Sequence, residues 1–129
     1  MTAISKTFLI GIGAFVGANL RYWLGGWIQD RLGHQIPWGT GLVNVSGSLA
    51  IGIVMAMLAH SESPSFARLL VVTGLLGGFT TFSAFSYELT SLLNYGAFGR
   101  AAVYFVGTNA LCIASCWIGF VGTRWAMSQ

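Results

Sequence analysis

Apolar residues dominate four long stretches of this sequence, and polar or charged residues gather where each stretch ends. We expect membrane spans at about 7–28, 38–59, 66–95 and 101–125. Each stretch has about 20 or more residues, enough to cross roughly 30 Å of hydrocarbon as a helix. The apolar runs are continuous, whereas a membrane strand alternates apolar and polar positions. The pattern predicts an all-α membrane protein with one four-helix transmembrane domain over 1–129.

The third predicted span contains an interruption that a lipid-facing helix would not need. Gly77 and Gly78 are adjacent, and glycine costs helix stability. Four hydroxyl side chains follow at Thr80, Thr81, Ser83 and Ser86. Inside hydrocarbon, broken backbone is tolerated only where it is buried in protein or lines a wet cavity. We therefore predict a third helix that is broken in mid-membrane and that forms the working part of a channel or transporter.

The composition agrees with an integral membrane protein. Of 129 residues, 55% are hydrophobic and 7% are charged, whereas a soluble domain carries roughly 25% charged residues. The net charge of +3 comes from nine charged side chains with no basic cluster, which argues against nucleic-acid binding. We expect the first apolar run to be retained as a span and not cleaved as a signal peptide.

The positive charges give no clear orientation in the membrane. They divide evenly between the two sides that four spans would define, with Lys6, Arg68 and Arg124 on one side and Arg21, Arg31 and Arg100 on the other. Orientation follows an asymmetry of Lys and Arg near span ends. We infer that the chain inserts both ways and that two copies pair as an antiparallel, dual-topology homodimer. The alternative is a weak bias that translocation or a partner overrides.

Small residues recur at four-residue spacing in several spans. The pairs are Gly13 and Gly17, Ala14 and Ala18, Ser48 and Gly52, and Gly74 and Gly78. Such pairs let helix backbones approach closely. The spacing leaves open whether they pack within one chain or between two chains.

Several polar side chains fall inside the predicted spans, and each has two interpretations. The Asn44 amide either joins helices or donates to an anion or water in a vestibule. Arg21 either snorkels to the interface or draws anions into a pore mouth. Glu88 either pairs with Arg21 or satisfies other polar groups as a structural partner, and we prefer the structural interpretation.

The fourth span carries a polar stripe. Tyr104, Thr108 and Cys112 are spaced by four and share one helix face. The two hydroxyls of this stripe are candidate donors along a path. Asn109 is offset by about 100° from Thr108, so we expect it to face elsewhere.

Phe82 and Phe85 are three residues apart and share a face if the chain is helical there. They lie beside Thr80, Thr81 and Ser83. Aromatic rings have a positive edge, so these rings could face an anion without a full charge to trap it. The alternative is ordinary packing against the core or lipid.

The sequence shows no catalytic set, so we predict that the protein is not an enzyme. No lysine follows the glycine run, so there is no phosphate loop and no nucleotide site. Cys112 and Cys116 share a helix face, and we interpret them as packing residues, with a metal or redox pair as the alternative. We interpret His34 and His60 as solvated loop residues.

The run at 77–88, Gly-Gly-Phe-Thr-Thr-Phe-Ser-Ala-Phe-Ser-Tyr-Glu, resembles the signature of the Fluc (CrcB) fluoride channels. Supporting segments lie at 17–22, 39–44 and 74–76, and the resemblance covers all four spans in order. It implies a fluoride-selective channel that exports fluoride from the cytoplasm across the inner membrane by passive conduction. It further implies an antiparallel homodimer with two pores, each lined by both subunits.

The resemblance also implies roles for individual residues. A structural sodium ion would be held at the dimer centre by the backbone carbonyls of Gly77 and Thr80. The implied fluoride pore comprises Phe82, Phe85, Asn44, Tyr104 and Thr108, to which we add the hydroxyls of Thr81 and Ser83, with Arg21 in the vestibule. Cys112 stands where relatives often carry serine, and a thiol is a poor donor.

Two rival functions remain at this stage. A small multidrug exporter would exchange protons for cations through a carboxylate in the first span, and 7–28 contains none. A non-transporting membrane subunit would not require the interrupted third span. The expected partners are fluoride, lipid and a second copy of the chain, with no nucleic acid and no nucleotide.

Overall fold

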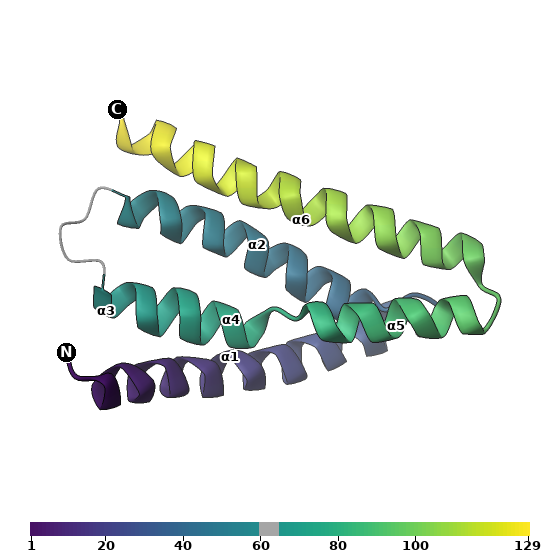
Figure 1. Ribbon diagram of the computed structural model, residues 1–129. Helices are drawn as coiled ribbons and strands as arrows, with labels where there is room; N and C mark the ends of the chain where they lie inside the picture. Colours follow the sequence, from purple (N-terminus) through teal and green to yellow (C-terminus); the bar gives the residue numbers. More distant parts are fainter. Residues whose placement is uncertain (60–64) are drawn as a thin grey trace.

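The computed structural model describes residues 1–59 and 65–129, and the elements it describes are all helical (Figure 1). They are α1 (Ala3–Leu32), α2 (Trp38–Leu58), α3 (Ser65–Ala67), η1 (Arg68–Leu76), α4 (Gly77–Phe79), α5 (Phe82–Asn94) and α6 (Phe98–Met127). Segment η1 is a π-helix, which is wound more loosely than an α-helix. We expected a polar loop at 60–65. Its residues 60–64, His60 included, lie outside the described residues.

Four stretches are long and apolar enough to cross a membrane: Ala3–Leu32, Trp38–Leu58, Arg68–Asn94 and Phe98–Met127. The prediction of four spans is therefore confirmed, and the chain is a multi-pass membrane protein. The first and last helices extend several residues beyond the predicted bounds. The sequence pattern marked the apolar part of each helix, whereas backbone hydrogen bonding continues through polar end residues such as Arg31.

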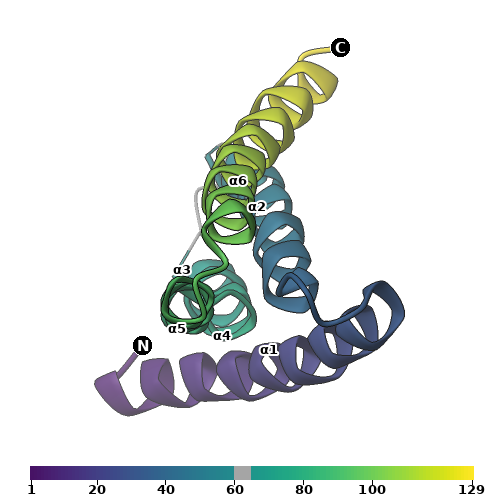
Figure 2. The same cartoon turned by 90° about the vertical axis from the view of Figure 1, so that its right-hand side faces the viewer.

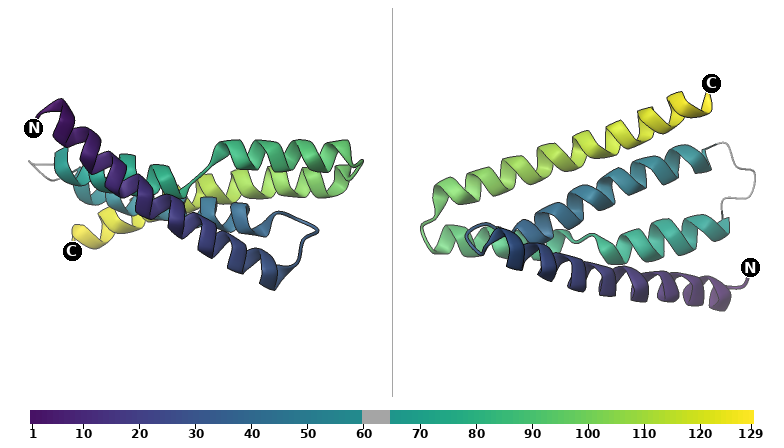
Figure 3. Two further views of the ribbon diagram at one scale, coloured as in Figure 1. Left: turned by 90° about the horizontal axis from the view of Figure 1, so that it is seen from below. Right: turned by 180° about the vertical axis from the view of Figure 1, so that it is seen from behind.

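Both termini lie at one end of the molecule (Figures 1 and 3). The opposite end carries the two tight connections, α1 to α2 and α5 to α6. Each connection contains a glycine with positive φ, 89° at Gly33 and 70° at Gly96. That backbone conformation strains a residue with a Cβ atom but costs glycine little. The chain can therefore reverse direction within a few residues.

Helix α1 packs against η1 and α4, and then crosses to the start of α2 (Figure 2). The contacts are made through glycine. A Cβ on Gly13 would overlap Leu70 O, and a Cβ on Gly17 would overlap Leu75 O. These glycines therefore pack within one chain, which answers the question that their spacing left open.

Helices α2 and α6 form the second close pair and lie side by side (Figures 1 and 3). A Cβ on Gly52 would overlap Cys116 O, and a Cβ on Gly119 would approach Leu49 O to 2.6 Å. Backbone meets backbone here, as in other membrane helix pairs with small residues at the contact. These two glycine-lined contacts position the elements that surround the interruption.

Few side chains are buried within the single chain. The buried apolar side chains are Val43, Ala56, Leu76, Phe85, Ala101 and Tyr104. The accessible surface is 8186 Å², compared with about 6,600 Å² for a compact soluble monomer of this mass. Large apolar side chains are exposed on each of the four long helical stretches, which suits a protein surrounded by lipid or by further protein.

Candidate functional site

The third span changes conformation at two residues. Helix α4 ends at Phe79 and α5 begins at Phe82. Between them, Thr80 (φ −83°, ψ 156°) and Thr81 (φ −153°, ψ 120°) are extended. The pieces on either side belong to one candidate span. The depth of the two extended residues in a bilayer stays a prediction.

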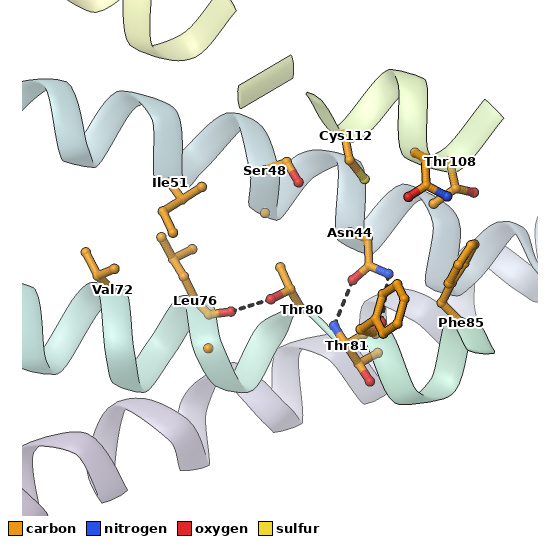
Figure 4. A pocket seen from close by; sticks show the side chains of 14 residues that line it. Asn44, Ser48, Ile51, Val72, Leu76, Thr80, Thr81, Phe85, Thr108 and Cys112 are labelled. Carbon is orange, nitrogen blue, oxygen red and sulfur yellow. Dashed lines mark hydrogen bonds between the residues drawn. The ribbon is translucent and has the colours of Figure 1, made fainter. Parts of the chain in front are cut away.

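Asn44 on α2 braces this extended segment with two hydrogen bonds (Figure 4). Its Nδ2 donates to Thr81 O at 2.9 Å, and its Oδ1 accepts from Thr81 N at 2.8 Å. In a continuous α-helix the Thr81 N–H would donate to the carbonyl of Gly77, four residues earlier. The side chain of Asn44 therefore replaces a helical partner, and it retains one further N–H for another acceptor.

Threonine side chains satisfy the backbone on both sides of the interruption. Thr80 Oγ1 donates to Leu76 O at 3.0 Å, the carbonyl that also accepts from Thr80 N. Thr81 Oγ1 accepts from Ala84 N at 3.2 Å and caps the start of α5, as N-terminal threonines commonly do. The same oxygen lies 3.1 Å from Ser83 Oγ. The hydroxyls that mark the interruption in the sequence thus also stabilise it.

Arg21 reaches the interruption from α1. Its Nη1 donates to Thr80 O at 3.4 Å, which is a long hydrogen bond. Arg21 also lines a cavity of about 280 Å³ between α1 and the start of α2, together with Thr40 and Glu88. Among the described residues it makes no ion pair with Glu88. Of the two interpretations of Glu88, pairing with Arg21 is therefore not supported.

Glu88 instead holds two hydroxyl groups from different helices. Thr40 Oγ1 on α2 donates to its Oε1, and Tyr104 OH on α6 donates to its Oε2, both at 2.7 Å. Hydrogen bonds to a charged acceptor are stronger than neutral ones. Glu88 is the structural partner that the preferred interpretation proposed. It joins α2, α5 and α6 at one point.

A cavity of about 370 Å³ opens beside the extended segment (Figure 4). It is lined by most of the residues singled out in the sequence: Asn44, Gly77, Thr80, Thr81, Phe82, Phe85, Thr108 and Cys112. Three of the sequence-predicted site residues, Arg21, Ser83 and Tyr104, do not line it. The residues described around this cavity include no charged side chain, so its polarity comes from hydroxyls, amides and backbone groups.

The two phenylalanines differ in environment. Phe85 is 3% exposed and packs on Tyr104 with the ring centroids 5.0 Å apart, whereas Phe82 is 73% exposed. The rings of Phe82 and Phe85 lie 5.6 Å apart. Within one chain, one ring is fixed by its neighbours and the other is open to whatever covers this face.

Two polar lining residues were missed from the sequence. Asn109 was expected to face elsewhere, and that expectation is wrong, because Asn109 lines the same cavity as Thr108. The cavity is wide enough to include positions about 100° apart on α6. Ser48 also lines it, and its spacing of four from Asn44 was the signal that could have identified it.

The remaining candidates have ordinary surroundings. His34 and Asp30 are more than three-quarters exposed, with 4.0 Å between His34 Nε2 and Asp30 Oδ1. Cys112 and Cys116 are free thiols. No group of three or more His, Cys, Asp or Glu side chains gathers anywhere in the described ranges.

Comparison with known proteins gives consistent matches over nearly the whole chain. A family model described as CrcB-like protein, Camphor Resistance (CrcB), matches residues 8–120. Proteins named fluoride-specific ion channel FluC are similar to this chain. The one from Roseiflexus sp. (strain RS-1) is 48% identical over 85% of this chain and 90% of its own. Those from Chloroflexus aurantiacus and Thermus thermophilus are 44% and 38% identical, each over more than nine-tenths of both chains.

Proposed function

The chain belongs to the CrcB family, and from that membership we propose that it is a fluoride-selective channel that exports fluoride from the cytoplasm by passive conduction. The family identifies it as a channel protein and not an enzyme, and it does not favour the multidrug exporter or the non-transporting subunit. The observation that carries the proposal is the uncharged polar cavity beside Thr80 and Thr81.

The donors around this cavity suit a small, strongly hydrated anion. Fluoride needs closely placed donors to replace its water, and it must bind weakly enough to leave. The cavity offers the spare N–H of Asn44, the hydroxyl of Thr108 and the amide of Asn109. A buried lysine or arginine would bind the anion too tightly for conduction. The ring edges of Phe82 and Phe85 would add weak positive potential.

The single chain leaves this cavity open, which supports a second copy as its cover. Phe82 is largely exposed at the rim, and the accessible surface of the chain exceeds that of a compact monomer. We propose an antiparallel homodimer in the inner membrane with two pores, each completed by residues of both subunits. The even distribution of Lys and Arg between the two ends supports insertion in both orientations.

The extended segment also fits a structural sodium ion in its donor chemistry. Sodium is a hard cation that prefers oxygen ligands. The N–H of Thr81, which in a continuous helix would donate to the Gly77 carbonyl, donates to Asn44 instead. Thr80 is extended. The carbonyls of Gly77 and Thr80 are therefore both suitable ligands. Arg21 bonds the same Thr80 oxygen at 3.4 Å. When bound, sodium would supply positive charge between the two copies, while the hydroxyls, amides and rings of the cavity contact the anion.

Liposomes that contain the purified protein test the proposal. Loaded with fluoride or with chloride, they should release fluoride quickly and retain chloride, and protein-free liposomes should retain both. Equal release of both halides would contradict a fluoride-selective channel. Growth of cells that lack their own fluoride defence, with and without this gene, separates the rivals, since an exporter of cationic drugs would protect against the drugs and not against fluoride.

A further inference from the structure

Two free thiols lie on one face of α6. Cys112 and Cys116 are half-buried and are not joined in a disulfide. They are four residues apart, and helix neighbours at this spacing have Cβ atoms about 5–6 Å apart. A ligand that needs two sulfur atoms can therefore bind both side chains without a change in the backbone.

The face that carries the thiols is the face that meets α2. Cys112 lines the cavity beside the extended segment together with Ser48, and its sulfur points from α6 toward α2 (Figure 4). One helical turn later, the carbonyl of Cys116 lies against Gly52 of α2. The two cysteines thus lead from the wall of the cavity into the contact between α2 and α6, and a small ion can reach them from the cavity.

The number and kind of ligands restrict the ion that would bind. Thiolate is a soft ligand and selects soft metal ions. No group of three or more His, Cys, Asp or Glu side chains gathers in the part of the chain that the structure describes, so the pair suits an ion that needs two ligands in a line. A metal–sulfur bond of about 2.3 Å requires sulfur atoms about 4.6 Å apart in such a site, which side chains at this spacing can provide.

The charge of the ion matters because the thiols lie within a membrane span. Each thiol loses its proton when it binds a metal. With a divalent ion, two metal–sulfur bonds form, two protons pass to water and the site has no net charge. A monovalent ion would leave one negative charge in the span, where a charge is costly. The described residues that line the cavity include no charged side chain to balance it.

We propose that Cys112 and Cys116 form a two-coordinate site for a soft divalent cation, for which Hg²⁺ is the probe. The site goes beyond the proposed function, and its binding chemistry does not depend on that function. Because Cys112 lines the cavity, a bound ion would occupy part of its wall. In the proposed channel, the ion would therefore slow the efflux of fluoride.

Titration of the purified protein in detergent tests the site. One Hg²⁺ per chain should consume both thiols and release two protons, whereas methylmercury, which has one free coordination position, should require two ions per chain. Against free cysteine as competitor, the native chain should retain Hg²⁺ to concentrations about a hundredfold higher than Cys112→Ser or Cys116→Ser, because the second thiol binds within the same chain.

The double variant Cys112→Ser, Ser115→Cys is the matched control. It keeps two thiols, but on adjacent residues that do not face each other on a helix, so it should retain Hg²⁺ no better than the single variants. Retention equal to that of the native chain, by this variant or by either single variant, would overturn the proposal. Two Hg²⁺ bound per native chain would overturn it as well, whether or not the variants fold.

Efflux from liposomes tests where the site lies. One Hg²⁺ per chain should slow fluoride efflux about tenfold or more, because the ion occupies part of the pore lining. The variant Cys112→Ser, Cys116→Ser should be insensitive to Hg²⁺. Bound Hg²⁺ with unchanged efflux would overturn the position of the site on the path. A native chain that releases no fluoride before Hg²⁺ is added would contradict the proposed function instead, and the titration would still decide the site.

Discussion

The two halves of the third membrane segment are held in different ways. Before the interruption, η1 and α4 pack on α1 through glycine, and the backbone around Gly74 and Gly78 lies against the backbone of α1. After the interruption, α5 is held by the carboxylate of Glu88, which accepts from α2 and α6, and by the buried ring of Phe85, which packs on Tyr104. Both halves line the cavity beside the extended segment, the first through Val72, Leu76 and Gly77 and the second through Phe82 and Phe85.

This difference shows how a small membrane protein makes room for an ion. Lipid is as apolar as leucine, so close packing of small residues provides much of the attraction between helices. The face of a segment that is packed in that way leaves no room for water or ions. Hydrogen bonds from longer side chains join α5 to α2 and α6. The interruption at Thr80 and Thr81 lies between the half that is anchored on α1 and the half that Glu88 holds, and residues of both halves line the cavity beside it.

The largest expected effect comes from filling a glycine contact in the anchored half. In Gly17→Leu the new side chain would enter the space of Leu75 O, and backbone cannot rotate away as a side chain can. We expect destabilisation by more than about 3 kcal/mol and loss of monodisperse protein in detergent. Size-exclusion chromatography and thermal unfolding in detergent measure this.

Gly11→Leu is the matched control on the same helix. A Cβ at Gly11 has no heavy atom within 4 Å, so the leucine should be accommodated on the outer face of α1. If both variants unfold equally, the contact between α1 and η1 is not what anchors this half.

A smaller effect should follow removal of the brace at the interruption. Asn44→Leu leaves the N–H and C=O of Thr81 without their side-chain partner. Each unsatisfied buried group costs about 1–3 kcal/mol. Partial access of water to the cavity should keep the total loss of stability at about 2 kcal/mol. Fluoride efflux should fall at least tenfold, because a shift of Thr81 displaces the cavity wall.

Asn19→Leu is the control for that change. The Asn19 amide is exposed and donates only to Phe15 O of its own helix. This variant should keep both stability and efflux. If Asn44→Leu conducts like the native chain, Asn44 neither braces the interruption nor contributes to the path.

The smallest expected effect tests the polar stripe of α6. Cys112 lines the cavity beside the extended segment. In Cys112→Ser a hydroxyl replaces the weak thiol donor, which should raise fluoride efflux about twofold. Cys116→Ser, which lies outside the cavity lining, should change nothing. Equal responses of the two variants in the liposome assay would show that Cys112 does not contribute to the path.

Much of the arrangement can be predicted from the sequence because it depends on neighbours along the chain. Apolar runs long enough to cross a bilayer define the four spans. The hydroxyls that follow Gly77 and Gly78 mark where regular backbone ends, since competing side-chain hydrogen bonds act locally. The two glycines are themselves helical, and Gly78 packs on Ala14, so their weak helix propensity does not end the helix. The spacing of Phe82 and Phe85 likewise placed both residues on one cavity.

Partners across helices could not be predicted in this way. Asn44 had two interpretations until the structure placed Thr81 within 3 Å of it. Glu88 was a possible partner of Arg21, and it instead accepts from Thr40 and Tyr104.

The amino-acid sequence by itself thus determined the four apolar spans, the neighbourhood of the extended residues in the third span and which side chains within the spans are polar. Tertiary structure alone decided which polar groups meet, that Asn109 joins the cavity, and that Glu88 links Thr40 of α2 to the stripe of α6. The physical reason is the distance along the chain over which each effect acts. Hydropathy and helix propensity act over a few residues, whereas a hydrogen bond requires two helices to bring their atoms within about 3 Å.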